Sequence, residues 1–501
     1  MGVTPQAATE YEIVIGLEVH SQLLTESKMF CACSAAYQDS PPNTTVCAVC
    51  LGMPGALPVM NRKAVDYVIR TGLALGCEIS GFTKFDRKNY PYPDLMKGYQ
   101  ISQYDQPVAY GGCLTIETDA GEKLIGVTRV HLEEDVAKLF HRSDDFGENY
   151  SLLDINRAGV PLMEIVSEPD MRSPDEARSY LTQLQSILRY IGVSSANMEE
   201  GNFRCDANIS VRPLGSLELG AKVEIKNMNS FRAVHRALQH EADRQVRAVK
   251  EGESIVQETR GWDEATATTF TQRTKEYAHD YRYFPEPDLP PLLIGKDWVQ
   301  GVHQELPELP GARKRRFMSE YGLSEYDANL LTVGKATADY FESVVCLKQD
   351  SGDALEQFAK HVSNWILVEL GRLLNESGGD IADLKIKPKS LVELLDMVSD
   401  GTLSNNMAKT VFEDMFGSGN APAAIAEERG LVQISDADAL GSAVDDAISS
   451  NPKPVAEYLE GKEQAIRFLV GQVMRITRGK ANPQLATQLL KERLDAIRQS
   501  A

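Results

Sequence analysis

Alternating apolar and polar residues predict β-strands along the chain up to about residue 296. Residues 12–20, EIVIGLEVH, direct their aliphatic side chains to one face and Glu18 and His20 to the other. A carboxylate and an imidazole two positions apart on a polar face suit a metal site, and a solvated strand edge has the same pattern. The pattern alone leaves both interpretations open.

Two further segments predict a β-hairpin with one apolar and one charged face. FRCDANISVRP (203–213) alternates strictly, and KVEIK (222–226) continues the alternation after a short loop. The charged face brings together Arg204, Asp206, Asn208 and Lys226. Cations mixed with carboxylates and an amide suit a metal–phosphate surface. An ordinary solvated strand face looks the same.

The stretch 130–168 holds several carboxylates around the turn NRAGVP. Strand alternation makes Glu133 and Glu134 face opposite ways, so only one of them can point at a shared site. In PLMEIVSE, Glu164 and Glu168 lie on one face. Alternation allows Glu134 and Glu164 to face one site, in which case Glu133 is turned away. Glu168 has no assigned role.

Helices are marked by capping residues and by apolar residues three and four apart. One helix is predicted over 63–75, a second begins after Ser173, and a third is capped by Ser230 and ends near Lys250. After about residue 297, helical periodicity replaces strand alternation. The patterns predict an α+β fold in which a domain built on a mixed or antiparallel sheet precedes helical domains.

The composition fits a globular protein of two or three domains, since the chain has 501 residues. A formal net charge of −20 argues against non-specific coating of nucleic acid. Residues 451–501 nevertheless carry nine Lys or Arg and five Asp or Glu, a local balance of 9 − 5 = +4. A basic helical end suits phosphate contact, and a solvated pair of C-terminal helices is the alternative.

Neither a secretory signal nor a membrane span is predicted. The N-terminus lacks a basic region followed by an apolar one, and no window approaches 18 consecutive apolar residues. Eight cysteines in this length do not suit a secreted disulfide scaffold, so a reducing cytoplasm is expected. No GxxxxGK[ST] motif occurs, and any ATP site is therefore not a P-loop.

Four cysteines form a candidate zinc site. Cys31, Cys33, Cys47 and Cys50 give a C-x-C-x13-C-x2-C pattern, in which two close pairs can converge tetrahedrally across a short loop. Structural zinc is the favoured interpretation, and a reduced thiol cluster or a redox pair is the alternative.

Several longer segments resemble GatB, one of the components of the tRNA-dependent amidotransferases. They are IGLEVHSQL, KFDRKNYPYPD, LDINRAGVPLMEIVSEPD, MEEGNFRCDANISVRP, EIKNMNSF, DYRYFPEPD, GLVQISD and GQVMRITRGKANPQL. These segments follow the family's order from about Tyr11 to the C-terminus. The resemblance implies a cradle domain over 1–296, a helical domain over 297–400 and a helical tail over 401–501 that binds tRNA.

The resemblance also implies a reaction. Glu mischarged on tRNA(Gln), or Asp mischarged on tRNA(Asn), is phosphorylated on its side-chain carboxylate by ATP, and ammonia then displaces phosphate to give the amide. The ammonia comes from glutamine hydrolysed in the amidase subunit GatA, and the small subunit GatC holds the complex together. A synthetase that mischarges the tRNA is a further expected partner. The competing hypothesis is a zinc-stabilised, non-catalytic tRNA-binding scaffold.

Residue roles follow from the same resemblance. The implied Mg²⁺ ligands are His20, Glu134 and Glu164, with Glu18 close by. Motif and strand face together assign Arg204, Asp206, Asn208 and Lys226 to nucleotide or phosphate contact. Lys88 and Lys97 resemble positions near the exit of the ammonia tunnel. Some family members carry the cysteine quartet and others lack it, so a zinc ion there is expected to be structural.

Overall fold

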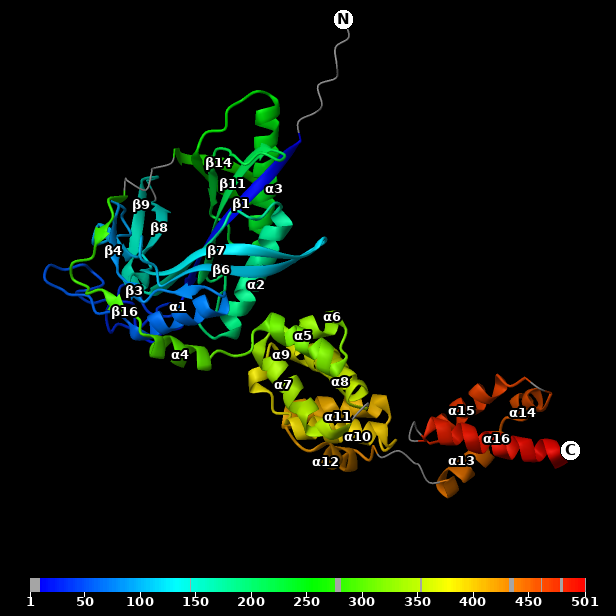
Figure 1. Cartoon of the computed structure of the whole chain (residues 1–501). Coiled ribbons are helices and arrows are strands. Elements are labelled where there is room, and N and C mark those ends of the chain that lie inside the picture. Colours follow the sequence, from blue (N-terminus) through cyan, green and yellow to red (C-terminus); the bar gives the residue numbers. More distant parts are fainter. Residues whose placement is uncertain are drawn as a thin grey trace, which may run out of the picture. The chain divides into compact units, whose positions relative to one another are not determined.

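The computed structural model describes residues 10–144, 146–274, 281–351, 354–431, 437–460, 462–477 and 481–500. The chain divides into two compact units, Met1–Pro310 and Gly311–Ala501. The first unit combines sheet and helices and the second is helical, which confirms the predicted α+β class (Figure 1).

Within the described residues, nine strands of the first unit form one mixed sheet in the order β14-β13-β12-β11-β1-β10-β7-β6-β2. Neighbouring strands are antiparallel except for β12 and β13, which are parallel. The strands are β1 Tyr11–Gln22, β2 Glu78–Ile79, β6 Ala109–Thr118, β7 Gly121–Glu134, β10 Pro161–Ser167, β11 Phe203–Pro213, β12 Val223–Lys226, β13 Glu258–Asp263 and β14 Thr268–Thr274. The predicted hairpin is present as the antiparallel pair β11–β12.

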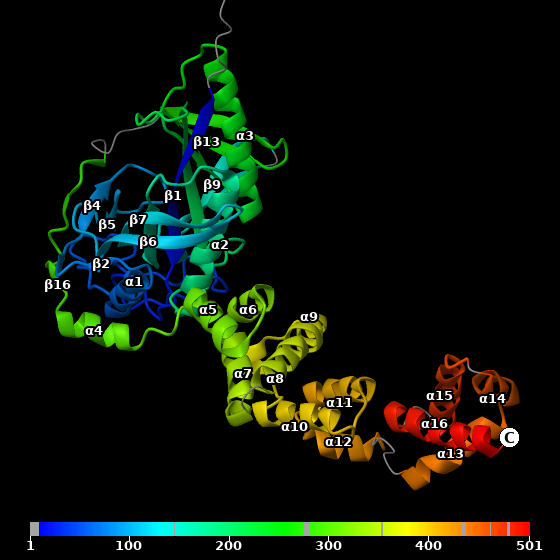
Figure 2. The same ribbon diagram turned by 45° about the vertical axis from the view of Figure 1, so that its right-hand side comes forward.

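Helices α1 (Arg62–Ala74), α2 (Pro174–Tyr190) and α3 (Phe231–Lys250) pack their apolar sides against the apolar face of this sheet (Figures 1 and 2). The predicted caps are present, since Ser173 accepts from the amide of Glu176 and Ser230 accepts from the amide of Ala233. Burial of this face leaves the polar face of the central strands available for a site.

Shorter strands pair in smaller sheets over the rest of the first unit. They are β3 Phe82–Thr83, β4 Asp86–Asn89, β5 Tyr99–Ser102, β8 Lys138–Ser143, β9 Asn149–Asp154, β15 Phe284–Pro285 and β16 Leu292–Leu293. The sheet β15-β4-β5 brings the segment after residue 281 beside the segment around residue 88.

The first unit extends past the predicted boundary at residue 296. Helix α4 (Lys296–Gln304) packs on α1, where Trp298 Nε1 donates to Asp66 Oδ1 at 2.6 Å. Val302 of α4 is buried in the same core as the sheet. This docking explains why the sheet-containing unit ends near Pro310.

The second unit contains two apolar cores. Its helices are α5 Pro310–Tyr321, α6 Glu325–Thr332, α7 Lys335–Val345, α8 Ala354–Asn364, α9 Gly371–Ser377, α10 Pro388–Ser399, α11 Asn405–Ser418, α12 Pro422–Glu428, α13 Ala437–Ser449, α14 Pro452–Leu459, α15 Ala465–Ile476 and α16 Pro483–Ser500. One core runs from Phe317 to Ala426 and the other from Leu440 to Leu494. The predicted boundary at residue 401 therefore falls inside the first of these cores.

Among the described residues, none of the helices combines the length and apolarity that a bilayer span requires. Two of the basic residues counted in the C-terminal segment, Arg478 and Lys480, lie outside the described residues. The same holds for most of GLVQISD and for Asp280 of DYRYFPEPD.

Candidate active site

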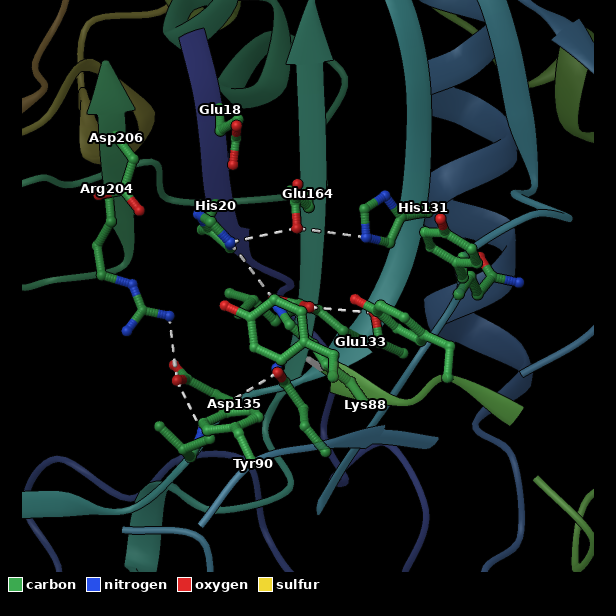
Figure 3. Close-up of a pocket in the computed structure, with 18 of the residues that line it drawn as sticks. Glu18, His20, Lys88, Tyr90, His131, Glu133, Asp135, Glu164, Arg204 and Asp206 are labelled. Carbon is green, nitrogen blue, oxygen red and sulfur yellow. Dashed lines mark hydrogen bonds and ion pairs between the residues drawn. The ribbon is translucent and has the colours of Figure 1, made fainter. Parts of the chain in front are cut away.

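The register of four central strands arranges polar side chains in rows across the sheet. Successive partners in one row are His131 (β7), Glu164 (β10), His20 (β1) and Arg204 (β11). Successive partners in the next row are Arg129, Val166, Glu18 and Asp206. Directly paired residues point to the same face of a sheet, so four strands that are distant in sequence contribute to one surface (Figure 3).

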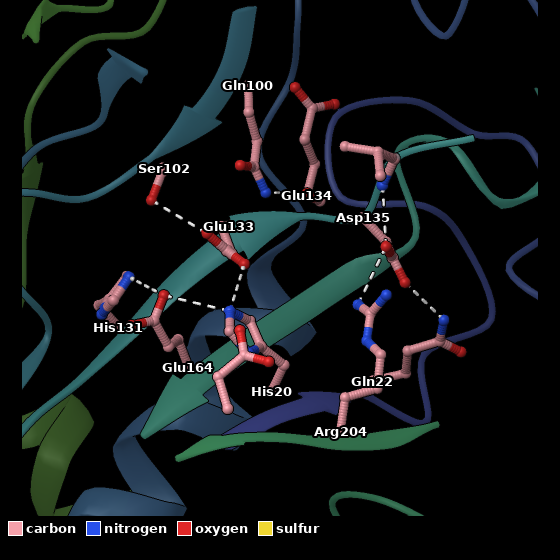
Figure 4. A network of polar contacts seen from close by, with 12 residues as sticks. His20, Gln22, Gln100, Ser102, His131, Glu133, Glu134, Asp135, Glu164 and Arg204 are labelled. Atoms are coloured by element: carbon pink, nitrogen blue, oxygen red, sulfur yellow. Dashed lines mark hydrogen bonds and ion pairs between the residues drawn. The ribbon is translucent and has the colours of Figure 1, made fainter. Parts of the chain in front are cut away.

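His20, Glu133 and Glu164 form the centre of this surface and are called the triad below. His20 Nε2 lies 3.5 Å from Glu133 Oε1 and 3.4 Å from Glu164 Oε2. On the other side of Glu164, His131 Nε2 lies 3.3 Å from the same Oε2 (Figure 4). Ligand atoms of His20, Glu133 and Glu164 all lie within 4.8 Å of one another, close enough to share one metal ion.

The prediction that Glu134, rather than Glu133, faces this site is wrong. Alternation counted from His131 puts Glu133 on the face of Glu164 and turns Glu134 to the other face. Glu134 is paired instead with Lys97 and accepts from the amide of Ile101 at 3.0 Å. Figure 4 shows its side chain turned away from the triad.

The electrostatics of the triad couple His20 to its carboxylates. Burial would lower the pKa of His20, but the hydrogen bond and charge of Glu164, together with the charge of Glu133, raise it to about 9. Burial would raise the pKa of Glu164, but His131 and His20 hold it well below its usual range. Glu164 is therefore an ionised carboxylate, as a metal ligand must be.

The triad lies in a cavity of about 490 Å³ between the polar face of the main sheet and the smaller sheet β15-β4-β5. Lys88 of β4 lines this cavity, with its Nζ 5.2 Å from the ring centroid of Tyr281. Burial would lower the pKa of Lys88, but Glu133 and Glu164 hold it above its usual range, so Lys88 is a cation. Four tyrosines, Tyr90, Tyr104, Tyr281 and Tyr283, form an aromatic wall of this cavity.

Three of the residues assigned to nucleotide contact, Arg204, Asp206 and Lys226, line the other edge of the same cavity, where each cation is paired with a carboxylate. Arg204 Nη2 is 3.0 Å from Asp135 Oδ1, and Lys226 Nζ is 2.6 Å from Asp206 Oδ2. This side of the cavity is lined by Glu18, Arg204, Asp206, Glu224 and Lys226. Asn208 donates to Glu18 Oε1 at 2.8 Å and so holds that carboxylate in place.

Lys97 lies beside the site rather than in it. The Lys97–Glu134 pair lines a narrow cavity of about 10 Å³. This small cavity shares three lining residues, Gln100, Asp135 and Val136, with the main cavity. Of the two predicted lysines, the structure places Lys88 in the main cavity and Lys97 next to it.

The four predicted cysteines converge. The Sγ atom of Cys50 lies 3.4 Å from that of Cys31, 3.8 Å from that of Cys47 and 3.9 Å from that of Cys33. A tetrahedral ZnS4 centre with Zn–S of about 2.3 Å separates its sulfurs by roughly 3.8 Å. A hydrogen bond from Cys31 and the charge of Lys28 lower the pKa of Cys50 to about 4. The spacing of the quartet therefore fits zinc.

Sequence reasoning missed His131, Arg129 and the contribution of Tyr281 and Tyr283. The signal for the first two was present, because Arg129, His131 and Glu133 occupy alternate positions of one strand. The tyrosines belong to a segment almost 200 residues from Lys88, and no local pattern links them.

Comparison with known proteins gives a consistent result. Residues 13–300 match the GatB/GatE catalytic domain, and residues 339–494 match the GatB domain. The chain is 58% identical to the GatB-type component of the aspartyl/glutamyl-tRNA(Asn/Gln) amidotransferase of Dehalococcoides mccartyi (strain CBDB1), over 97% of this chain and 99% of that protein. It is 55% identical to the corresponding protein of Moorella thermoacetica, over 97% of this chain and 100% of the relative.

Proposed function

Because the chain belongs to the GatB family of aspartyl/glutamyl-tRNA(Asn/Gln) amidotransferase components, we propose that it activates and amidates the side-chain carboxylate of Glu-tRNA(Gln), Asp-tRNA(Asn) or both. A carboxylate oxygen attacks the γ-phosphorus of ATP and ADP leaves. Ammonia then attacks the acyl carbon, inorganic phosphate leaves, and the nitrogen gives up one proton to form the amide.

The observation that carries this proposal is the convergence of His20, Glu133 and Glu164 in a cavity that also holds cationic side chains. Two buried carboxylates supply the oxygen ligands that Mg²⁺ prefers, and His20 completes the set. Glu18 lies on the same face, one row away. A Mg²⁺ ion held by these residues would neutralise the charge of the nucleotide phosphates.

The chain's own residues position the reacting groups. Asp135 orients Arg204, and Asp206 orients Lys226, so that both cations face the cavity from fixed positions. Lys88 supplies a positive charge from the opposite wall. Tyr90 and Tyr281, which lie against Lys88, restrict water, which would hydrolyse an acyl phosphate.

Ammonia needs a separate entry to this site. The narrow cavity lined by Lys97 and Glu134 adjoins the main cavity, and its other lining residues include Leu95, Met96 and Ala158. We assign it to the end of an ammonia route from a glutaminase partner, GatA, in a complex that also contains GatC. The helical tail, with its local excess of positive charge, is assigned to tRNA, and the cysteine quartet to structural Zn²⁺.

The test uses the purified amidotransferase complex with a mischarged tRNA, ATP and ammonium as the nitrogen donor. Glu164→Gln should lower the rate of ATP-dependent amidation by at least about 100-fold. Glu122→Gln is the matched control, because Glu122 is an exposed carboxylate at the far end of β7. Full amidation by the Glu164→Gln complex would contradict the proposal and would favour the non-catalytic scaffold. Assays with both Glu-tRNA(Gln) and Asp-tRNA(Asn) identify the substrate.

A further inference from the structure

The cations around the main cavity differ in whether a carboxylate already holds them. Arg204 and Lys226 each have an ion-pair partner on the β11–β12 side. Within the described part of the chain, Arg129 makes no hydrogen bond or ion pair through its side chain, and its Nε atom is buried without a partner. A partly buried guanidinium without a partner is a site for an anion.

Arg129 lies on the side of the triad opposite the β11–β12 hairpin. The strand order β12-β11-β1-β10-β7 puts Lys226 and Asp206 at one end of the polar surface and Arg129 at the other. Neighbouring strands are about 4.8 Å apart, so these ends are separated by most of the width of the cavity. Val166 and Glu18 lie between these ends in the same row, and His20 and Glu164 lie in the neighbouring row.

A second cavity of about 600 Å³ begins at Arg129. Its lining includes Ser80, Phe82, Gln106 and Thr128, and among the described residues it shares Arg129 and Tyr104 with the main cavity. These two residues therefore stand where the cavities meet.

Tyr104 adds aromatic surface at this junction. Its ring stacks on that of Tyr283, with 4.3 Å between centroids and 11° between planes. Tyr104 is nevertheless 44% exposed. An exposed aromatic ring beside an arginine matches a nucleotide, because the ring can stack on a base while the guanidinium binds a phosphate.

We propose that Arg129 and Tyr104 bind the 3′-terminal nucleotide of the aminoacyl-tRNA where it passes from the second cavity into the main one. This assignment rests on the proposed function. In-line phosphoryl transfer places the attacking carboxylate and the leaving ADP on opposite sides of the phosphoryl group. With ATP on the β11–β12 side, the aminoacyl end approaches from the side of Arg129. Arg129 is a positioning residue in this scheme.

The test measures steady-state kinetics of the purified complex with ammonium as donor, varying mischarged tRNA at saturating ATP and ATP at saturating tRNA. Arg129→Gln and Tyr104→Ala should each raise the KM for tRNA about 10-fold and change kcat and the KM for ATP less than about 2-fold. Arg129→Lys keeps the positive charge but lacks the planar guanidinium that can form two parallel hydrogen bonds. It should give a KM for tRNA between those of the wild type and Arg129→Gln. Arg178→Gln, on the exposed side of α2, is the control.

An unchanged KM for tRNA in both variants, or a rise confined to the KM for ATP, would overturn the assignment. Thermal melting of each complex shows whether the variant is folded. The Glu164→Gln result separates the proposed function from the proposed nucleotide subsite. If Glu164→Gln abolishes amidation and the Arg129 variants show normal tRNA kinetics, only the nucleotide subsite is contradicted. If the Glu164→Gln complex retains amidation, the proposed function itself is contradicted.

Discussion

His20 and Glu164 face each other directly across the pair β1–β10, with Nε2 3.4 Å from Oε2. The pKa of His20, raised to about 9 by Glu164 and Glu133 against the effect of burial, makes the imidazole a cation at neutral pH in the metal-free protein. The two residues then form an ion pair that a metal ion replaces, since a ligating imidazole must be neutral.

Glu164→Gln should lower the pKa of His20 from about 9 towards the ordinary 6.5, because the substitution removes the main group that stabilises the imidazolium. Histidine-selective NMR of the metal-free protein measures this pKa. The pair's contribution to stability should be complete below pH 6.5 and lost as the pH rises through about 9, since the folded-state pKa is the higher one. Glu168→Gln should leave the titration unchanged, and an unshifted His20 in Glu164→Gln would contradict the electrostatic account.

Lys97→Met should separate glutamine-driven from ammonium-driven amidation. If the Lys97–Glu134 cavity admits ammonia, glutamine-dependent turnover should fall about 10-fold, while turnover at saturating ammonium stays within about 2-fold of wild type. Lys123→Met, on β7 but paired with Glu176, is the control. Equal losses with both donors would show that Lys97 serves the chemical step or the fold instead.

Cys47→Ser should abolish zinc binding, since a structural zinc site needs all four ligands. Atomic absorption should find one zinc per chain in the wild type and almost none in the variant. The melting temperature should fall, because metal binding contributes to folding free energy. Cys113→Ser alters an exposed thiol outside the quartet and should keep its zinc. If the wild-type protein contains no zinc even when the growth medium supplies it, the result would favour a reduced thiol cluster over a zinc site.

Glu241→Gln should destabilise the first unit by about 3 kcal/mol at neutral pH, because it removes the charge from a buried ion pair. Glu241 is fully buried and accepts from Arg244 at 2.6 Å and from Thr269 at 2.9 Å. Burial would raise its pKa, but these partners hold the pKa below its usual value.

The stabilisation by Glu241 should be complete above about pH 4.5 and lost as the pH falls through the lower, folded-state pKa. Denaturant unfolding at pH 7 and at lower pH measures the difference between wild type and variant. Asp243→Asn, on the exposed side of the same helix, is the control. A difference independent of pH would argue for packing rather than charge.

The local features of the fold were predictable from the sequence. The helices that begin after Ser173 and Ser230 start as their capping residues indicate, and strict alternation located β11 and β12. These features depend on interactions a few residues apart, which a sequence pattern displays directly. The end of the first unit did not follow from the pattern, because it depends on the docking of Trp298 against Asp66.

The site was only partly predictable, for a related reason. His20 and Glu164 were identified, and the family resemblance then drew attention to Glu134 in place of Glu133. The choice between adjacent glutamates depends on register, and shifting the count by one position reverses every side chain of a strand. Tyr283 approaches the triad only through tertiary pairing, which one sequence does not display.

The central position of β1 has a consequence for synthesis of the chain. Glu18 pairs with Val166 on one side and with Asp206 on the other. At roughly 5–20 residues per second, the ribosome needs about 10–40 s after making β1 to deliver both neighbours. During that interval the first strand, with its aliphatic face, lacks one or both of its native partners. The nascent chain should therefore be a strong client of ribosome-associated chaperones, and its active site should be among the last parts of the first unit to assemble.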